Sequence, residues 1–141
     1  MKMIPLMAAL MVMAGAILPA GASTMDAYRW KNRVLVLFAG MDDAQVDEQR
    51  QILMPHEDGL ADRDMVIFAV VEDGILPVYG QAPAAGEAAA LRAEFGVQPG
   101  SPFTALLVGK DGGVKWRENR PAAQHELFGL IDSMPMRRNE R

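Results

Sequence analysis

The acidic residues that follow two apolar segments are the side chains best suited to chemistry. Asp42 and Asp43 come shortly after one segment, and Glu72 and Asp73 come directly after the other. Carboxylates gathered at one site can bind a hard cation or serve an enzyme as acid and base. The same residues also suit ordinary structural purposes, because aspartate favours the start of a helix and an acidic pair before glycine is typical of a turn. The spacing matches no calcium-binding loop, which favours the structural interpretation over a cation site.

The absence of cysteine excludes a large part of protein chemistry. The chain has 141 residues, two histidines, 11 methionines and no cysteine. Disulfides, thiolate catalysis, iron–sulfur clusters and cysteine-ligated zinc all require a thiol. His56 and His125 are far apart in the sequence, which disfavours a two-histidine metal site. Met134 and Met136 offer soft donors for copper, but methionine more often fills gaps in a core. We therefore predict no metal and no cofactor.

The first 22 residues have the pattern of a signal peptide. Lys2 gives a positive start, residues 3–18 are apolar without a charge, and residues 20–22 (AGA) are small, as a signal peptidase requires. A membrane anchor is the alternative, but this apolar run is shorter than about 18 residues and is interrupted by proline. The pattern predicts cleavage after Ala22, a single domain over residues 23–141, a periplasmic or secreted location and no stable membrane anchor after cleavage.

The net charge limits the kinds of partner. Lys and Arg number 14 against 18 Asp and Glu, which gives a formal charge of -4 at pH 7. An acidic chain without a basic stripe is poorly suited to nucleic acids or to anionic membranes. The partner is therefore expected to be a protein or a small ligand.

Two continuous apolar runs predict the central strands of a sheet. Residues 34–39 and 65–71 contain no polar side chain, which is typical of strands that are buried on both faces in a parallel sheet. Between them, Asp42 with a glutamine three residues later predicts the start of a helix. Pro55 must end or kink this helix.

The second half of the chain predicts two further helices and a hairpin. One helix is expected over residues 87–95, with Gly96 as its C-terminal cap. A strand at 103–108 is joined by a glycine-rich turn to an alternating strand at 114–117. The last helix is expected from Pro121 until a second proline, Pro135, closes it.

These elements follow the order β-α-β-α-β-β-α. A right-handed crossover places the first two strands side by side and parallel, while the C-terminal hairpin extends the sheet antiparallel. The prediction is an α/β fold, a single thioredoxin-like domain with a mixed sheet. Residues 74–86 form a long connection, either an extra strand or a recognition loop.

Four short segments resemble a family of uncharacterised bacterial proteins, the domain of unknown function 4174. They are residues 28–33 (YRWKNR), 63–64 (RD), 109–113 (GKDGG) and 134–137 (MPMR), and the resemblance covers nearly all of the predicted mature chain. The resemblance implies a thioredoxin-like or peroxiredoxin-like fold without an established reaction. In redox-active relatives of this fold the working cysteines follow the first central strand, and here that place reads GMDDA.

The resemblance also draws attention to the proline before the third central strand. In thioredoxins a cis-proline commonly faces the redox site, and Pro102 lies at the corresponding position. Most bonds before proline are trans, so an ordinary turn residue is the alternative.

The edge of the sheet where the parallel strands end is the expected binding site. Ligands of open α/β sheets usually bind at the carboxyl ends of the strands. The candidate ligand or partner residues on this edge are Met41, Asp42, Asp43, Glu72, Asp73 and Pro102. Their charge favours a cation or a basic partner over an anion.

Trp30 and Arg33 are candidates for a second partner-binding surface. Tryptophan and arginine are enriched among the residues that dominate binding energy at interfaces. The competing interpretation is that Trp30 covers the sheet while its basic neighbours face water.

Taken together, the residues predict an exported, non-catalytic thioredoxin-like module that binds a protein or a small ligand. No catalytic residue is assigned, and no thiol redox activity is expected because there is no cysteine. The alternative is a metal-dependent or other non-thiol enzyme that uses the carboxylates at the ends of the parallel strands.

Overall fold

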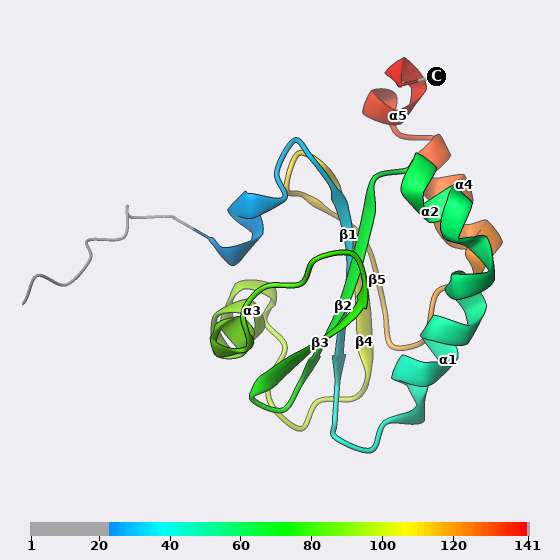
Figure 1. The fold of residues 1–141 in the computed structure, drawn as a ribbon. Coiled ribbons are helices and arrows are strands. Elements are labelled where there is room, and N and C mark those ends of the chain that lie inside the picture. Colours follow the sequence, from blue (N-terminus) through cyan, green and yellow to red (C-terminus); the bar gives the residue numbers. More distant parts are fainter. Residues whose placement is uncertain (1–22, 141) are drawn as a thin grey trace, which may run out of the picture.

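The computed structural model describes residues 23–140, so the predicted signal peptide lies outside the described residues. A five-stranded sheet is covered by helices on both faces (Figure 1). The strands are β1 (Arg33–Ala39), β2 (Met65–Val71), β3 (Gly74–Tyr79), β4 (Thr104–Val108) and β5 (Val114–Glu118). The α-helices are α1 (Ala44–Leu53), α2 (Glu57–Asp62), α3 (Ala88–Phe95), α4 (Gln124–Asp132) and α5 (Pro135–Asn139). Three short 3-10 helices are η1 (Thr24–Ala27), η2 (Met54–His56) and η3 (Ala85–Glu87).

The strand order is β3-β2-β1-β4-β5, with β1 in the centre. Strands β1 and β2 are parallel and in register from Arg33 beside Met65 to Ala39 beside Val71. All other neighbouring pairs are antiparallel, including the hairpin of β4 and β5. The predicted α/β class, the central position of the first two strands and the C-terminal hairpin are confirmed.

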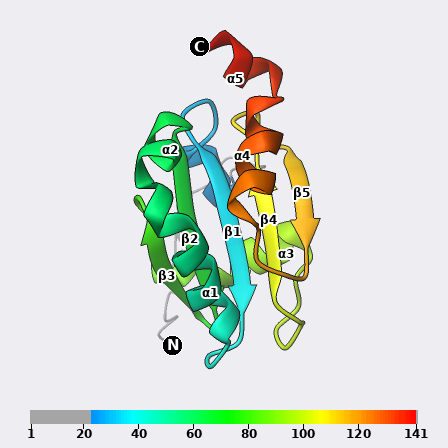
Figure 2. The same cartoon turned by 90° about the vertical axis from the view of Figure 1, so that its right-hand side faces the viewer.

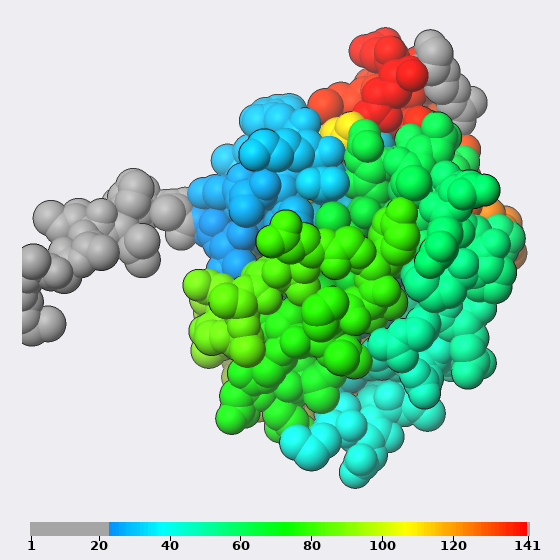
Figure 3. Space-filling model, in the orientation of Figure 1, coloured from blue at the N-terminus to red at the C-terminus, as the bar shows by residue number. Residues whose placement is uncertain are grey.

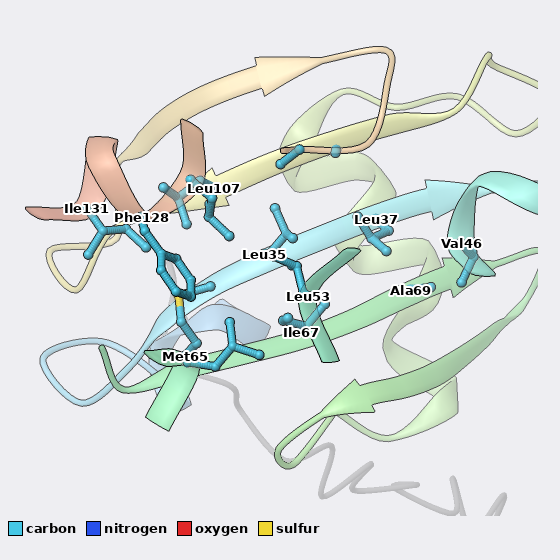
Figure 4. Packing of buried hydrophobic residues seen from close by; sticks show 14 of the residues in the cluster. Leu35, Leu37, Val46, Leu53, Met65, Ile67, Ala69, Leu107, Phe128 and Ile131 are labelled. Atoms are coloured by element: carbon cyan, nitrogen blue, oxygen red, sulfur yellow. The ribbon is translucent and has the colours of Figure 1, made fainter. Parts of the chain in front are cut away.

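Alternate residues of the central strands supply two separate cores. Leu35 and Leu37 of β1 point to the face covered by α1, α2 and α4, where they pack against Leu53 and Ile67 (Figures 2 and 4). Residues of β1 between these, such as Val36, point to the other face, which η1 and α3 cover. Full burial of one such side chain stabilises the fold by about 1.5–3 kcal/mol, which explains why both runs are continuously apolar.

Proline and glycine set the ends of the helices much as predicted. Helix α1 ends at Leu53 because Pro55 cannot supply an N–H to the ladder, and the chain continues through η2 into α2. Helix α3 ends at Gly96, whose φ of 66° places it in the left-handed conformation of a C-terminal cap.

Three details differ from the predicted element order. The stretch after β2 includes an additional edge strand, β3, which contains Pro77 at the irregular part of its pairing. Helix α4 begins at Gln124, three residues after Pro121, and Pro135 begins α5 instead of only closing α4. Proline favours the first turn of a helix, which explains its place in α5.

Candidate functional site

The ends of β1 and β2 and the loop before β4 lie at one end of the sheet. Ala39 is beside Val71 at the ends of the parallel strands, and Phe38 is beside Thr104 at the start of β4. We call this end the acidic edge and define it as residues 40–43, 72–74 and 98–103. It is the place that the sequence predicted for Met41, Asp42, Asp43, Glu72, Asp73 and Pro102, and the structure brings these six residues to it.

Asp43 has a clear structural purpose at the acidic edge. It is the N-cap of α1, and its Oδ1 accepts a hydrogen bond from the backbone N–H of Gln45 at 2.9 Å. The helix start was expected at Asp42, so the cap lies one residue later than predicted. Asp42 and Met41 are exposed in the loop before it.

Replacing Asp43 with alanine is expected to lower the free energy of unfolding by about 1 kcal/mol, because the first-turn N–H groups lose their acceptor. Asparagine caps helices as well as aspartate does, so Asp43→Asn should leave stability nearly unchanged. Urea denaturation of the two variants measures the difference. Equal losses would show that the charge of Asp43, and not its hydrogen bond, stabilises the helix start.

The other carboxylates of the acidic edge do not converge on one point. Asp42, Glu72 and Asp73 are exposed. Glu72 has a φ of 49°, as the tight turn between β2 and β3 requires. Within residues 23–140, no group of three or more His, Asp or Glu side chains is placed to hold a metal ion. The turn and cap interpretation therefore describes these residues better than a preformed cation site.

A groove lies between the start of α1 and strand β3. It has a volume of about 420 Å³. Its apolar lining includes Met41, Val46, Val71, Ile75 and Leu76, with Asp43, Asp47 and Arg50 beside them. Figure 3 shows the loop after β1 and strand β3 on the same face, at the end of the molecule away from α5. We call this hollow the edge groove.

Two large apolar side chains of the edge groove are exposed to solvent. Met41 is 73% exposed and Leu76 is 43% exposed. Arg50, on the same groove, pairs with Asp47 at 2.6 Å. Exposed apolar side chains in one hollow are a feature of interaction sites, whereas isolated ones are ordinary.

A second hollow of about 410 Å³ lies on the other side of the loop after β1. Asp43, Glu72, Arg92 and Pro102 are among its lining residues. The Arg92 guanidinium reaches the carbonyl oxygen of Glu72 at 3.5 Å. Pro102 therefore lies beside the acidic turn as predicted. No cis peptide bond occurs among the described residues, so the bond before Pro102 is trans.

Trp30 and Arg33 lie at the opposite end of the sheet, where β1 begins. Trp30 is 64% exposed and has a φ of 67°, which is uncommon for a bulky residue. Its backbone N–H donates to the carbonyl of Lys110 at 2.7 Å, which holds the turn against the β4–β5 connection. The interpretation that Trp30 covers the sheet is therefore wrong, and Trp30 is available as a surface residue.

The expectation that the basic neighbours of Trp30 face water is wrong for Arg33. Its side chain is only 1% exposed, because position 33 points to the same face as Leu35. Its guanidinium pairs with Glu140 at 3.2 Å and donates to the carbonyl of Arg63 at 3.1 Å. Arg33 cannot contact a partner on the surface in this arrangement.

Arg33 belongs to a cluster of ion pairs that fastens the C-terminal segment to the domain. We call it the C-terminal ion cluster, and its members are Arg33, Asp62, Arg63, Asp64, Lys110, Asp132, Arg137 and Glu140. Arg63 binds both carboxylate oxygens of Asp132, at 3.1 and 2.8 Å, and lies over the ring of Phe128. Lys110 bridges Asp64 and Glu140.

The ion pairs of this cluster are not predictable from the sequence. Its members come from five separate parts of the chain, so no local pattern reveals them. The sequence held one indirect signal. Three of the segments that carry the family resemblance contribute to the C-terminal ion cluster or lie beside it, namely residues 63–64, 109–113 and 134–137.

The ion pairs determine the protonation of the cluster. Burial alone would lower the pKa of Lys110, but hydrogen bonds to Asp64 and Glu140 outweigh it and raise that pKa. Burial alone would raise the pKa of Glu140, but hydrogen bonds from Lys110 and Arg33 lower it below its ordinary value. The hydrogen bond to Asp62 is the main cause of the raised pKa of Arg137. All of these groups are charged at neutral pH.

The described residues contain no helix that is long and apolar enough to cross a membrane.

A solved structure supports the thioredoxin-like fold. The chain is similar to the crystal structure of reduced 2-Cys peroxiredoxin from Plasmodium vivax, with a TM-score of 0.59 and 13% identity over 82% of this chain and 84% of that one. At this identity the similarity shows the fold alone. No curated protein sequence matches the chain.

The chain is expected to lack thiol redox activity despite this fold. Disulfide exchange proceeds through attack by a thiolate, and the loop after β1 carries methionine and aspartate where a thiol would be needed. Methionine has no ionisable S–H and is oxidised to a sulfoxide instead. Insulin reduction with dithiothreitol and thiol-dependent peroxide consumption should both equal the buffer control. A rate above the control would contradict the expectation.

The family follows from a match that covers most of the chain. The family model described as a domain of unknown function, DUF4174, matches residues 24–140. The description assigns no reaction, ligand or partner. The chain belongs to the DUF4174 family and has a thioredoxin-like fold without a cysteine.

Proposed function

We propose that this protein is an exported, non-catalytic binding module whose partner is a protein segment. The segment would place an apolar side chain in the edge groove and basic side chains beside the acidic edge. The observation that carries the proposal is that Met41 and Leu76, two large apolar residues that are exposed to solvent, line one groove.

The charges around the edge groove support a basic partner. Asp42, Asp43, Asp47, Glu72 and Asp73 lie on or beside the groove, whereas the nearby cations are Arg50 and Arg92. Arg50 is already paired with Asp47. The surplus of negative charge attracts lysine and arginine side chains and repels acidic segments.

The enzyme alternative has less support at this edge. Asp43 uses a carboxylate oxygen to cap α1, and Glu72 and Asp73 are exposed on a turn. A catalytic acid or base usually has its pKa adjusted by burial or by a charged neighbour. The exposed carboxylates suit electrostatic attraction of a partner better than proton transfer.

Export is part of the proposal and rests on residues 1–22. Ser23 is held to the domain, because its hydroxyl donates to Glu94 at 2.7 Å and its backbone N–H donates to Asp26 at 3.0 Å. A new ammonium group at Ser23 would strengthen the bond to Asp26.

The mass of the intact exported protein is expected to correspond to residues 23–141. Mass spectrometry of protein purified from the periplasm or the medium measures it. A species that retains residues 3–18 in the membrane fraction would mean that the segment is an anchor and that the export proposal is wrong.

The binding proposal is tested by selecting peptides from a displayed random library on the processed protein. The selected peptides should combine one large apolar residue with two or more lysines or arginines. Leu76→Asp should weaken their binding by about tenfold or more, because it places a charge in an apolar contact. Trp30→Ala, at the opposite end, is the matched surface control and should bind as the wild type does.

Variants that replace carboxylates with amides separate the contribution of negative charge to affinity from that of the apolar groove. The double variant Glu72→Gln, Asp73→Asn should lower affinity and weaken its dependence on salt, because two attractive charges are lost. If Asp43→Asn, Glu72→Gln and Asp73→Asn leave affinity unchanged while Trp30→Ala abolishes binding by a folded protein, the functional surface is the Trp30 turn. The proposed site would then be wrong.

A further inference from the structure

A cavity lies beside the C-terminal ion cluster, far from the acidic edge. It has a volume of about 270 Å³ and lies between the β4–β5 turn and the start of α5. The lining residues that matter here are Arg33, Lys110, Lys115, Met134, Pro135 and Met136. We call it the turn cavity. It combines three cations with three apolar side chains, and Asp111 also lines it. Each of the three cations is paired with a carboxylate, that of Glu140, Asp64 or Asp111.

One buried donor at the turn cavity lacks a partner. Arg33 is almost completely buried, and its terminal nitrogens bind Glu140 and the carbonyl of Arg63. Its Nε makes no hydrogen bond to any described residue. A buried N–H without an acceptor is costly, and in native proteins such a group usually has a partner. Arg33 therefore keeps one unused N–H, although this nitrogen is itself enclosed by the residues around it.

The contacts of Glu140 show that the cations of the turn cavity bind a carboxylate. Its two carboxylate oxygens lie 3.2 and 3.3 Å from the terminal nitrogens of Arg33, and Lys110 donates to the same carboxylate. Glu140 is 26% exposed, although Arg33 and Lys110 beneath it are buried. It follows directly after α5, a helix of five residues. The present occupant of the cation pair is therefore partly in solvent and lies at the end of a short helix.

Lys115 adds positive charge at the mouth of the turn cavity. A Cβ atom at Gly109 would lie 2.6 Å from Cε of Lys115, so the glycine leaves room for this side chain to cross the turn. The Lys115 ammonium pairs with Asp111 at 2.8 Å, and the two side chains are 34% and 44% exposed. Because this pair is open to solvent, Lys115 can turn towards an incoming anion at little cost.

We propose that the turn cavity binds a small organic carboxylate with a short apolar chain. Its carboxylate would compete with Glu140 for Arg33 and Lys110. Its chain would lie against Met134, Pro135 and Met136. Inorganic phosphate lacks an apolar part and gains nothing from this lining. The proposal is independent of the edge groove, which lies at the other end of the sheet.

The test is a titration of the wild type and of Glu140→Gln with acetate, butyrate, hexanoate and inorganic phosphate. Amide chemical shifts measure the binding at each step of the titration. Affinity should rise from acetate to hexanoate, and shifts should concentrate at residues 109–115 and 133–136. Glu140→Gln should bind hexanoate about tenfold more tightly than the wild type, because the competing carboxylate is gone. Phosphate should bind more weakly than hexanoate.

Two cation variants provide a matched comparison. Lys115 and Arg120 each form a surface pair of 2.8 Å with an acidic residue, but only Lys115 lines the cavity. Lys115→Gln should weaken hexanoate binding by about threefold or more, and Arg120→Gln should leave it unchanged. Equal effects of the two variants would mean general attraction of anions and would overturn the proposal.

Three further results would also overturn it. The first is the absence of saturable hexanoate binding to folded Glu140→Gln. The second is phosphate binding as tight as hexanoate binding. The third applies if circular dichroism shows that Glu140→Gln does not fold. The wild type alone then decides, and the absence of hexanoate-dependent shifts at residues 109–115 would contradict the site.

Discussion

Replacing Glu140 with alanine is expected to lower the free energy of unfolding by about 3 kcal/mol at neutral pH, although the residue lies next to the end of the chain. The loss of one partner from a buried ion pair commonly costs about 3–5 kcal/mol, and we take the lower end because Glu140 is partly exposed. Arg33 would remain buried with its main anion removed, while Lys110 would keep Asp64.

The contribution of Glu140 to the free energy of unfolding should decrease as the pH falls into the acid range. The folded-state pKa of Glu140 is lowered, so its contribution is fully present above the ordinary pKa of glutamate. It is lost as the pH falls through the lower folded value. The difference in unfolding free energy between wild type and Glu140→Ala should therefore be constant near neutral pH and shrink in the acid range.

Urea denaturation at several pH values measures this difference. Glu126→Ala is the control, because Glu126 also pairs with an arginine, but this arginine, Arg120, is 50% exposed whereas Arg33 is buried, and pairs in contact with solvent contribute little. If Glu140→Ala and Glu126→Ala destabilise the protein equally, the C-terminal ion cluster does not fasten the segment as described here.

Replacing Gln49 with leucine is expected to lower the free energy of unfolding by about 3 kcal/mol, although leucine is apolar and favours helices. Gln49 is completely buried on α1. Its amide donates to the carbonyl of Ala122 at 3.0 Å and accepts from the N–H of Ala122 at 2.7 Å. Leucine would leave both backbone groups buried without a partner, and each such group costs about 1–3 kcal/mol.

Gln51→Leu in the same helix is the matched control, because Gln51 is exposed. Chemical denaturation of both variants gives the comparison, and Gln51→Leu should change stability by less than about 0.5 kcal/mol. A Gln49→Leu variant as stable as the wild type would show that the link between α1 and the segment before α4 is not important for the fold.

The features predicted correctly from the sequence are those set by short-range rules. The strands at 34–39 and 65–71 are recognisable because both faces are covered and every residue is apolar. Gly96 marks the end of α3 because a left-handed cap needs glycine. The meeting of the acidic residues at one edge followed from parallel strands, whose ends lie together.

The features that were missed depend on partners far away in the chain. Arg33 is buried because Glu140, 107 positions later, neutralises it. Gln49 is buried because the backbone of Ala122, 73 positions later, satisfies its amide. Local patterns place both side chains on the surface, since arginine and glutamine are rarely buried without a partner. Strand β3 was ambiguous because it is half-exposed and contains Pro77.

Mapping of a selected peptide on the processed protein by amide chemical shifts tests the central claim most directly. If the protein is a binding module that uses the edge groove, the perturbed residues should be 40–47 and 71–76, and the changes should saturate with one peptide per protein. Residues 28–33 and 109–113, at the other end of the sheet, should keep their shifts. Saturable changes confined to residues 28–33 and 109–113, with 40–47 and 71–76 unaffected, would contradict the account.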